Sequence, residues 1–259
     1  MYKPRVDSSL SEHFKDSRSR DEFRQALLAG YPRWYSPWAH LAGTLTPGIA
    51  ALVLSIVFVS ELRPIELLAV PITFVVSNLS EWHAHRNLLH RRWPLAAVLY
   101  DRHTPEHHRI YRYGQMSITR WQELRLVLIP AYGVFALVAI NAPLAALIGW
   151  LIGPNVGWLF LLTSALYIVS YELTHLSYHL PEQSFIGRRA FVRWMREHHA
   201  RHHDPRLMQR WNFNVTLPLG DWLFGTIAPK QLVDSVRKKP PNAAANAALL
   251  QEGANQPSA

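Results

Sequence analysis

Four short stretches decide this fold: HRNLLH at residues 85–90, HTPEHH at 103–108, HLSYH at 175–179 and HARHH at 199–203. They hold ten of the fourteen histidines in a chain of 259 residues. Scattered surface histidines would not recur at gaps of three, four and five residues in all four stretches. Imidazole is a common ligand of transition metals, and one metal ion takes about four to six ligands. Ten imidazoles therefore predict two metal ions; the alternative is a set of solvated basic loops.

We number these stretches as the first to fourth clusters. The predicted metal ligands are His85, His90, His103, His107, His108, His175, His179, His199, His202 and His203. The third cluster has its histidines four apart, and the fourth has them at i, i+3 and i+4, so each set should share one helix face. The second cluster is expected to supply a matching set. In the first cluster the gap of five separates the rings by roughly 140° on an ideal helix. Either the helix breaks there, or each ring serves a different metal.

Other polar residues near the clusters have weaker signals. His83 and His198 fall off the predicted faces and are expected not to bind metal. Glu172 lies three residues before His175, where it would orient that ring or simply end the helix. Further candidates to orient the ligands are Asn212, Asn214 and Asp221; the alternative for the aspartate is an ion pair with an arginine or a helix cap.

Long apolar runs separate the clusters and predict an all-α integral membrane protein with about four transmembrane helices. The expected spans are residues 45–60, 65–81, 124–140 and 160–179. The short 61–64 turn makes the first two spans an antiparallel hairpin. Residues 141–156 are expected to form a short helix lying in the outer leaflet.

The distribution of basic residues predicts the orientation. Lys and Arg number seven in residues 1–42, eight in 83–125 and eleven in 181–259, and only Arg63 lies on the other side. The positive-inside rule then places both termini in the cytoplasm, with a cytoplasmic histidine-rich helical cap. A bacterial inner membrane is expected rather than the endoplasmic reticulum. The net charge of +9 flanks apolar runs, which favours a membrane surface over nucleic acid as its partner.

A closing stretch, WNFNVTLPLGDWLFGT at 211–226, completes a recognisable order of motifs. Together with the clusters it resembles the fatty acid hydroxylase superfamily, which includes sterol desaturases and lipid hydroxylases, over about residues 72–228. Asn214 departs from the family, which usually has glycine there. The resemblance implies a membrane-bound non-haem di-iron oxidoreductase. It would hold two iron ions, use O2 as co-substrate and act on a lipid or fatty acyl chain entering from the bilayer.

Three parts of the chain are expected. Residues 1–42 form a cytoplasmic or interfacial segment, 43–230 a fatty acid hydroxylase-like membrane catalytic domain, and 231–259 a disordered tail. No cleavable signal sequence is expected. Ser19 with Glu22 predicts a capping box at the start of a short helix, and Thr104 predicts a second helix start.

Two other functions fit parts of the pattern. A sterol or lipid desaturase would use the same metal site, and no residue separates it from a hydroxylase. A divalent-metal transporter would place its ionisable ligands near the bilayer midplane, whereas these clusters lie at the ends of the spans. The sequence has no cysteine and no visible electron-carrier domain, so electrons are expected from an external donor, a reductase plus a small redox carrier.

Overall fold

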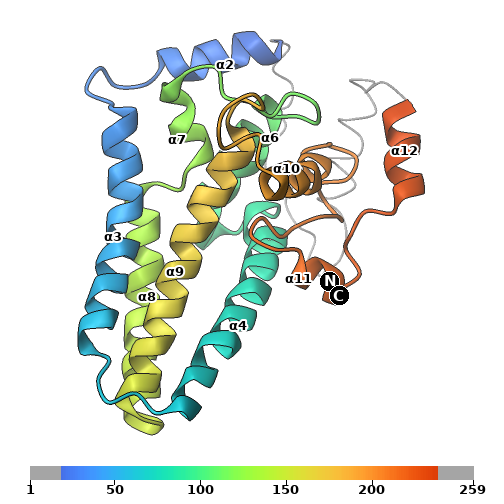
Figure 1. The fold of residues 1–259 in the computed structure, drawn as a ribbon. Coiled ribbons are helices and arrows are strands. Elements are labelled where there is room, and N and C mark those ends of the chain that lie inside the picture. The colour runs from blue at the N-terminus through green and yellow to red at the C-terminus, as the bar shows by residue number, and fades with distance from the viewer. Residues whose placement is uncertain (1–18, 239–259) are drawn as a thin grey trace.

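The computed structural model describes residues 19–238, which fold into helices with no named strand among them (Figure 1). Within this range, four helical stretches are long and apolar enough to cross a membrane. They contain α3 (Pro37–Phe58), α4 (Ala69–Ala84), α8 (Ala131–Leu151) and α9 (Pro154–His179). The predicted all-α membrane fold with four spanning helices is confirmed.

Helix α9 lies at the centre of this bundle and packs against α3, α4 and α8. Glycines allow two of these contacts to be close. A Cβ atom at Gly48 of α3 would lie 2.6 Å from a methyl group of Val169, and one at Gly157 of α9 would lie 2.4 Å from the Ala145 carbonyl oxygen. Small residues at such crossings let helix backbones approach, which is how helices associate in lipid.

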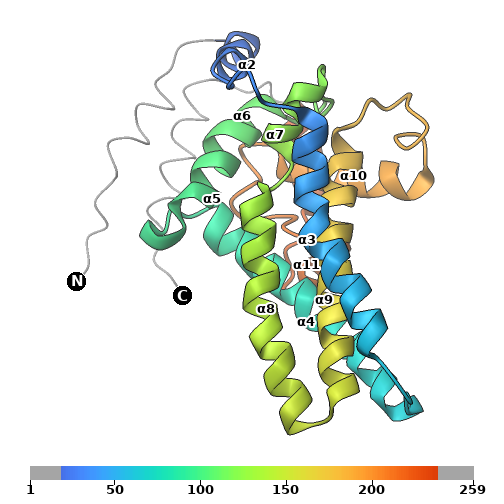
Figure 2. The same cartoon turned by 90° about the vertical axis from the view of Figure 1, so that its left-hand side faces the viewer.

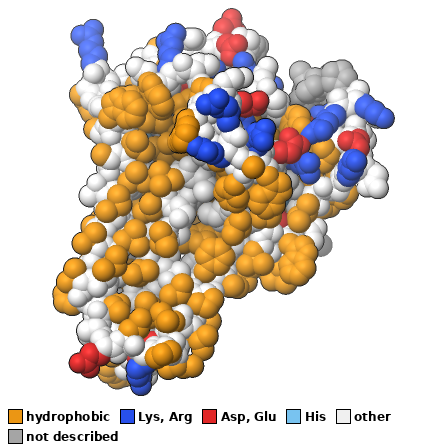
Figure 3. Space-filling view, viewed as in Figure 1, with side chains coloured by type: hydrophobic (Ala, Val, Ile, Leu, Met, Phe, Trp, Pro, Cys, Tyr) orange, Lys and Arg blue, Asp and Glu red, His pale blue; other side chains and the backbone are white. Residues whose placement is uncertain are grey.

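The outer surface of the bundle is apolar. Figure 3 shows hydrophobic side chains over most of its length. Charged side chains lie mainly at the top and right of this view. Ile56, Val57, Ile72 and Ile140 are each more than half exposed. Such a large apolar surface on a folded chain is the surface that a bilayer covers. The protein is therefore a multi-pass membrane protein.

The predicted third span and the outer-leaflet helix were wrong in their boundaries. Residues 128–130 break the helix, because the residue before Pro130 is disfavoured in the α conformation. α8 then continues through Pro143 to Leu151, so residues 141–156 are the end of α8, a turn at Gly153 and the start of α9. Proline is tolerated inside membrane helices, where neighbouring groups satisfy the freed carbonyl.

The remaining helices form a cap over one end of the bundle (Figures 1 and 2). They are α2 (Arg20–Ala29), α5 (Ala97–Arg102), α6 (His108–Ile110), α7 (Leu124–Val127), α10 (Ala190–His202), α11 (Leu219–Leu223) and α12 (Lys230–Lys238). The predicted capping box is confirmed, since the Ser19 and Glu22 side chains bond to each other's backbone. The disordered tail was placed too early: in α12, Val233 packs against Leu207 and Ala228. Its remainder, 239–259, and the lead-in 1–18 lie outside the described residues.

Candidate metal centre

The ten predicted ligands lie together in two groups of five, which we call site A and site B. Site A comprises His85, His90, His103, His108 and His202, and site B comprises His107, His175, His179, His199 and His203. In each group, one ring nitrogen per residue lies within 4.8 Å of the others, and all ten residues are buried. The expected grouping was wrong for the second and fourth clusters, because each is divided between the two sites.

The helix type explains which histidines pair within a cluster. Residues His85–Leu89 and His103–His107 are π-helical, whereas the third and fourth clusters lie on α-helices. The π-helical hydrogen bond joins residues five apart, so histidines at i and i+5 meet on one face. Both such pairs enter site A, and both i, i+4 pairs of the α-helices enter site B. Of the two alternatives for the first cluster, the break in the α-helix is confirmed.

The predicted helix start at Thr104 was wrong. The second cluster continues from α5 as a π-helix, and Thr104 lies inside it. Its hydroxyl donates to the Leu89 carbonyl at 2.7 Å and lies 3.2 Å from His90 Nδ1. Thr104 therefore joins the two π-helical segments of site A rather than capping a helix.

Backbone carbonyls fix the orientation of five of the rings. In site A, His85 Nδ1 donates to the Phe213 carbonyl and His202 Nδ1 to that of Trp211. In site B, the Nδ1 atoms of His107, His179 and His203 donate to the carbonyls of Leu126, Met116 and Tyr111 at 2.6–2.8 Å. A carbonyl only accepts, so the proton is on Nδ1 and the Nε2 lone pair faces the site.

The inner nitrogens approach one another at the spacing that a metal ion requires. The Nε2 atoms of His85 and His103 are 3.0 Å apart, those of His90 and His202 2.8 Å, and those of His199 and His203 3.0 Å. With metal–nitrogen bonds of about 2.0–2.1 Å, two ligands at 90° lie about 2.8–3.0 Å apart, whereas tetrahedral angles give about 3.3–3.4 Å. The spacing therefore fits a five- or six-coordinate ion better than a tetrahedral zinc site.

The histidines of the cap are in the state that binds metal. Burial, with the neighbouring imidazoles as the second cause, holds the pKa well below its usual value in His90, His103, His108, His199 and His203. Burial also lowers the pKa of His202 to about 4. These rings are neutral near pH 7, and a neutral imidazole is the form that coordinates a metal.

Several inner nitrogens need a partner that the protein does not provide. Among the described residues, the Nε2 atoms of His107, His175 and His179 are buried without a hydrogen bond. A buried polar atom without a partner is costly, and a metal ion would satisfy all three at once. The residues present therefore fit a pair of metal ions.

Glu172 does not have the predicted role toward His175. Its Oε2 atom accepts from the backbone N–H of Ile129 at 3.0 Å. The helix break before Pro130 leaves that N–H outside the helical hydrogen-bond ladder, and the carboxylate of α9 satisfies it. Glu172 thus holds the junction of α7 and α8 against α9.

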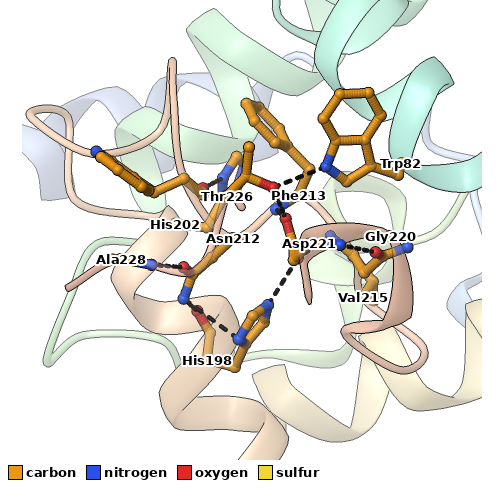
Figure 4. A network of polar contacts seen from close by, with 12 residues as sticks. Trp82, His198, His202, Asn212, Phe213, Val215, Gly220, Asp221, Thr226 and Ala228 are labelled. Carbon is orange, nitrogen blue, oxygen red and sulfur yellow. Dashed lines mark hydrogen bonds and ion pairs between the residues drawn. The ribbon is translucent and has the colours of Figure 1, made fainter. Parts of the chain in front are cut away.

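The closing stretch is held by a polar network around Asp221 (Figure 4). The Asp221 carboxylate accepts from the backbone N–H groups of Phe213 and Asn214, both at 2.8 Å, from the Thr226 hydroxyl at 2.6 Å, and from His198 Nε2 at 3.0 Å. The alternative of an ion pair with an arginine is not observed among the described residues; the side-chain partners are Thr226 and His198, and His198 lies outside both sites. His83 is exposed and contacts Asn87.

The two asparagines shape the same stretch. Asn212 adopts a left-handed backbone with φ of 59°, which asparagine tolerates, and its amide donates to the His198 carbonyl at 2.9 Å. The Asn214 side chain accepts from the backbone of Asp221 at 2.9 Å and donates to that of Asn78 at 3.1 Å. All three predicted residues thus lie around the carbonyls that orient site A. Those carbonyls, at Trp211 and Phe213, were missed because a backbone acceptor has no sequence signature.

Comparison with known proteins gives one match. A family model described as fatty acid hydroxylase matches residues 70–226, which is more than half of the chain. The match contains every histidine of sites A and B and the closing stretch. Comparisons with curated proteins and with solved structures find no match.

Proposed function

Because this chain belongs to the fatty acid hydroxylase family, we propose that it is an O2-dependent di-iron hydroxylase of a lipid or fatty acyl chain in the membrane. The observation that carries the proposal is the pairing of two buried sites, each with five inward-facing imidazole nitrogens. Nitrogen ligands suit iron, and five of them would leave one position of a six-coordinate ion open for a co-substrate.

Two irons, when bound, would supply the chemistry that reduces dioxygen and oxidises an unactivated C–H bond. The protein holds five of the ten rings by their outer nitrogens and buries all ten. Phe213 packs edge-on against His202 with ring centroids 5.6 Å apart, and Tyr111 lies 4.5 Å from His179. Both aromatic rings are fully buried and exclude water from the sites.

A lipid desaturase with the same metal site is the second candidate, since both reactions begin at an unactivated C–H bond. A metal transporter is disfavoured, because site residues at 85–90 and 175–179 lie at the ends of the spanning stretches and not at their centres. We also propose that the cap faces the cytoplasm, because Lys and Arg gather on that side of the predicted spans. A reductase with a small redox carrier would supply the electrons, because the sequence has no cysteine to hold an iron–sulfur cluster.

The test combines metal and product analysis. Protein purified from iron-replete cells should carry about two irons per chain, matching the two groups of histidines. Lipid extracts of cells with and without the protein are compared by mass spectrometry. A gain of one oxygen atom supports the hydroxylase, and a loss of two hydrogen atoms supports the desaturase. The matched control is His179→Ala, which should yield neither product. One tetrahedral zinc per chain would refute the proposal.

A further inference from the structure

Residues 211–216 form a segment beside site A that belongs to no helix or strand, and two of its carbonyls meet histidines of that site. The carbonyls of Trp211, Phe213 and Val215 accept from His202, His85 and the Tyr178 hydroxyl. One short segment thus presents three backbone acceptors, at residues 211, 213 and 215, to three different side chains. Two of the five rings of site A depend on it for their orientation.

Two carboxylates hold the backbone N–H groups of this segment. Asp221 accepts from residues 213 and 214, each at 2.8 Å. Glu81 of α4 accepts from Val215 and, at 3.3 Å, from Thr216. Four consecutive backbone N–H groups outside any helix are thus bound by side chains. Figure 4 shows Asp221 lying between this segment and His198.

Site B has a corresponding carboxylate, the fully buried Glu123. It accepts from the Tyr111 hydroxyl at 2.8 Å and from the backbone N–H groups of Thr119 and Arg120 at 2.9 and 3.1 Å. These contacts fix both ends of the loop from 111 to 120. The carbonyls that orient His203 and His179 belong to this loop, at residues 111 and 116.

We propose that Asp221 and Glu123 are positioning residues, each dedicated to one metal ion: Asp221 to site A and Glu123 to site B. Neither carboxylate contacts a histidine of either site; each acts through the backbone segment that it holds. The inference rests on the proposed two-iron centre. It goes further by making the two ions separately controllable, because the segments at 111–120 and 211–216 satisfy different rings.

The expected effect follows from the number of N–H groups released. Asparagine at 221 can accept with one oxygen only, and its amide nitrogen would face a second N–H group. One end of the segment is then unpaired, and its carbonyls no longer fix the rings of His85 and His202. Loss of such an outer partner weakens metal binding about 10–100-fold. Site B, whose rings bond to other carbonyls, should keep its affinity.

The experiment titrates ferrous iron anaerobically into the metal-free, full-length protein with two single variants, Asp221→Asn and Glu123→Gln. Each variant should lose about 10–100-fold affinity at one site only, and the Mössbauer spectra of the remaining iron should differ between them. The control is Glu66→Gln. Glu66 also accepts backbone and side-chain hydrogen bonds, from Arg63 and Asn155, but at the far end of the bundle. The Glu66→Gln variant should bind iron like the parent.

Amide hydrogen exchange of the metal-free protein gives a second readout. Asp221→Asn should deprotect the amides of 213 and 214 and leave 119 and 120 protected, and Glu123→Gln should do the reverse. If either variant does not fold, Thr226→Val and Tyr111→Phe each remove one donor to the same carboxylate and should give the same selectivity more weakly.

The outcomes separate the two proposals. A parent that does not bind two irons overturns the proposed function. A parent with two irons whose variants lose both ions in parallel, or lose neither, overturns only the dedicated positioning. Selective loss, with different spectra in the two variants, supports it.

Discussion

Adjacent histidines in α10 should respond oppositely to substitution. His199 belongs to site B, with its Nε2 atom 3.0 Å from that of His203. His198, one residue earlier and about 100° around the helix, instead donates to Asp221 at 3.0 Å. We therefore expect His198→Ala to keep about two irons and His199→Ala to lose the iron of site B.

The structure sets the magnitudes. His198→Ala removes one of the four hydrogen bonds that Asp221 accepts, and a hydrogen bond to a charged group contributes about 1.5–3 kcal/mol to the free energy of unfolding. Three donors remain, so the carboxylate stays bound and the 211–216 segment keeps its position. His199→Ala removes a metal ligand. The loss of iron affinity should exceed that caused by removing an outer hydrogen-bond partner, and is expected to be at least about 100-fold, or about 2.8 kcal/mol.

The assay measures iron per chain and the thermal unfolding midpoint of both variants in the same detergent. His198→Ala should melt several degrees lower than the parent with its iron content intact, whereas His199→Ala should hold about one iron. Product yield should survive in part for the first variant and vanish for the second. An iron-poor, inactive His198→Ala beside a parent-like His199→Ala would refute the assignment, because the ligand face would then be offset by one residue.

Three further predictions concern topology, electron supply and acid. A reporter fused after residue 259 should be active only in the cytoplasm, as the excess of Lys and Arg in 1–42, 83–125 and 181–259 requires; activity on the other side would contradict it. Purified protein given a nicotinamide cofactor and O2 alone should form no product until a reductase and a small redox carrier are added; turnover without them would show that the electron path is wrong. The metal-free protein should lose stability as the pH falls from about 6.5 to 4. The pKa of His202 is about 4 in the folded state and about 6.5 in the unfolded state, so the unfolded state binds more protons in this window. Thermal unfolding at pH 7.5, 6 and 5 tests this, and a midpoint that rises on acidification would refute it.

The sequence determined the parts of this protein whose signal is local. Apolar runs long enough for a bilayer gave the four spanning helices, because the bilayer dictates their length. The number and spacing of the histidines gave the ten residues that the fold brings together, and their order gave the family. The capping box at Ser19 was also readable, because both of its side chains bond within three residues.

Only the tertiary structure decided how the ten histidines are divided and what holds them. Assignment to a face by spacing assumes 3.6 residues per turn, and that assumption failed in the two π-helical segments, where residues five apart meet. The bonding partners of the carboxylates were equally unreadable: Glu172 binds the backbone of Ile129, and Asp221 binds a segment that in turn orients His85. These partners are backbone groups brought close by packing of distant segments. A backbone N–H or carbonyl is the same at every position, so only the folded arrangement selects which one a side chain meets.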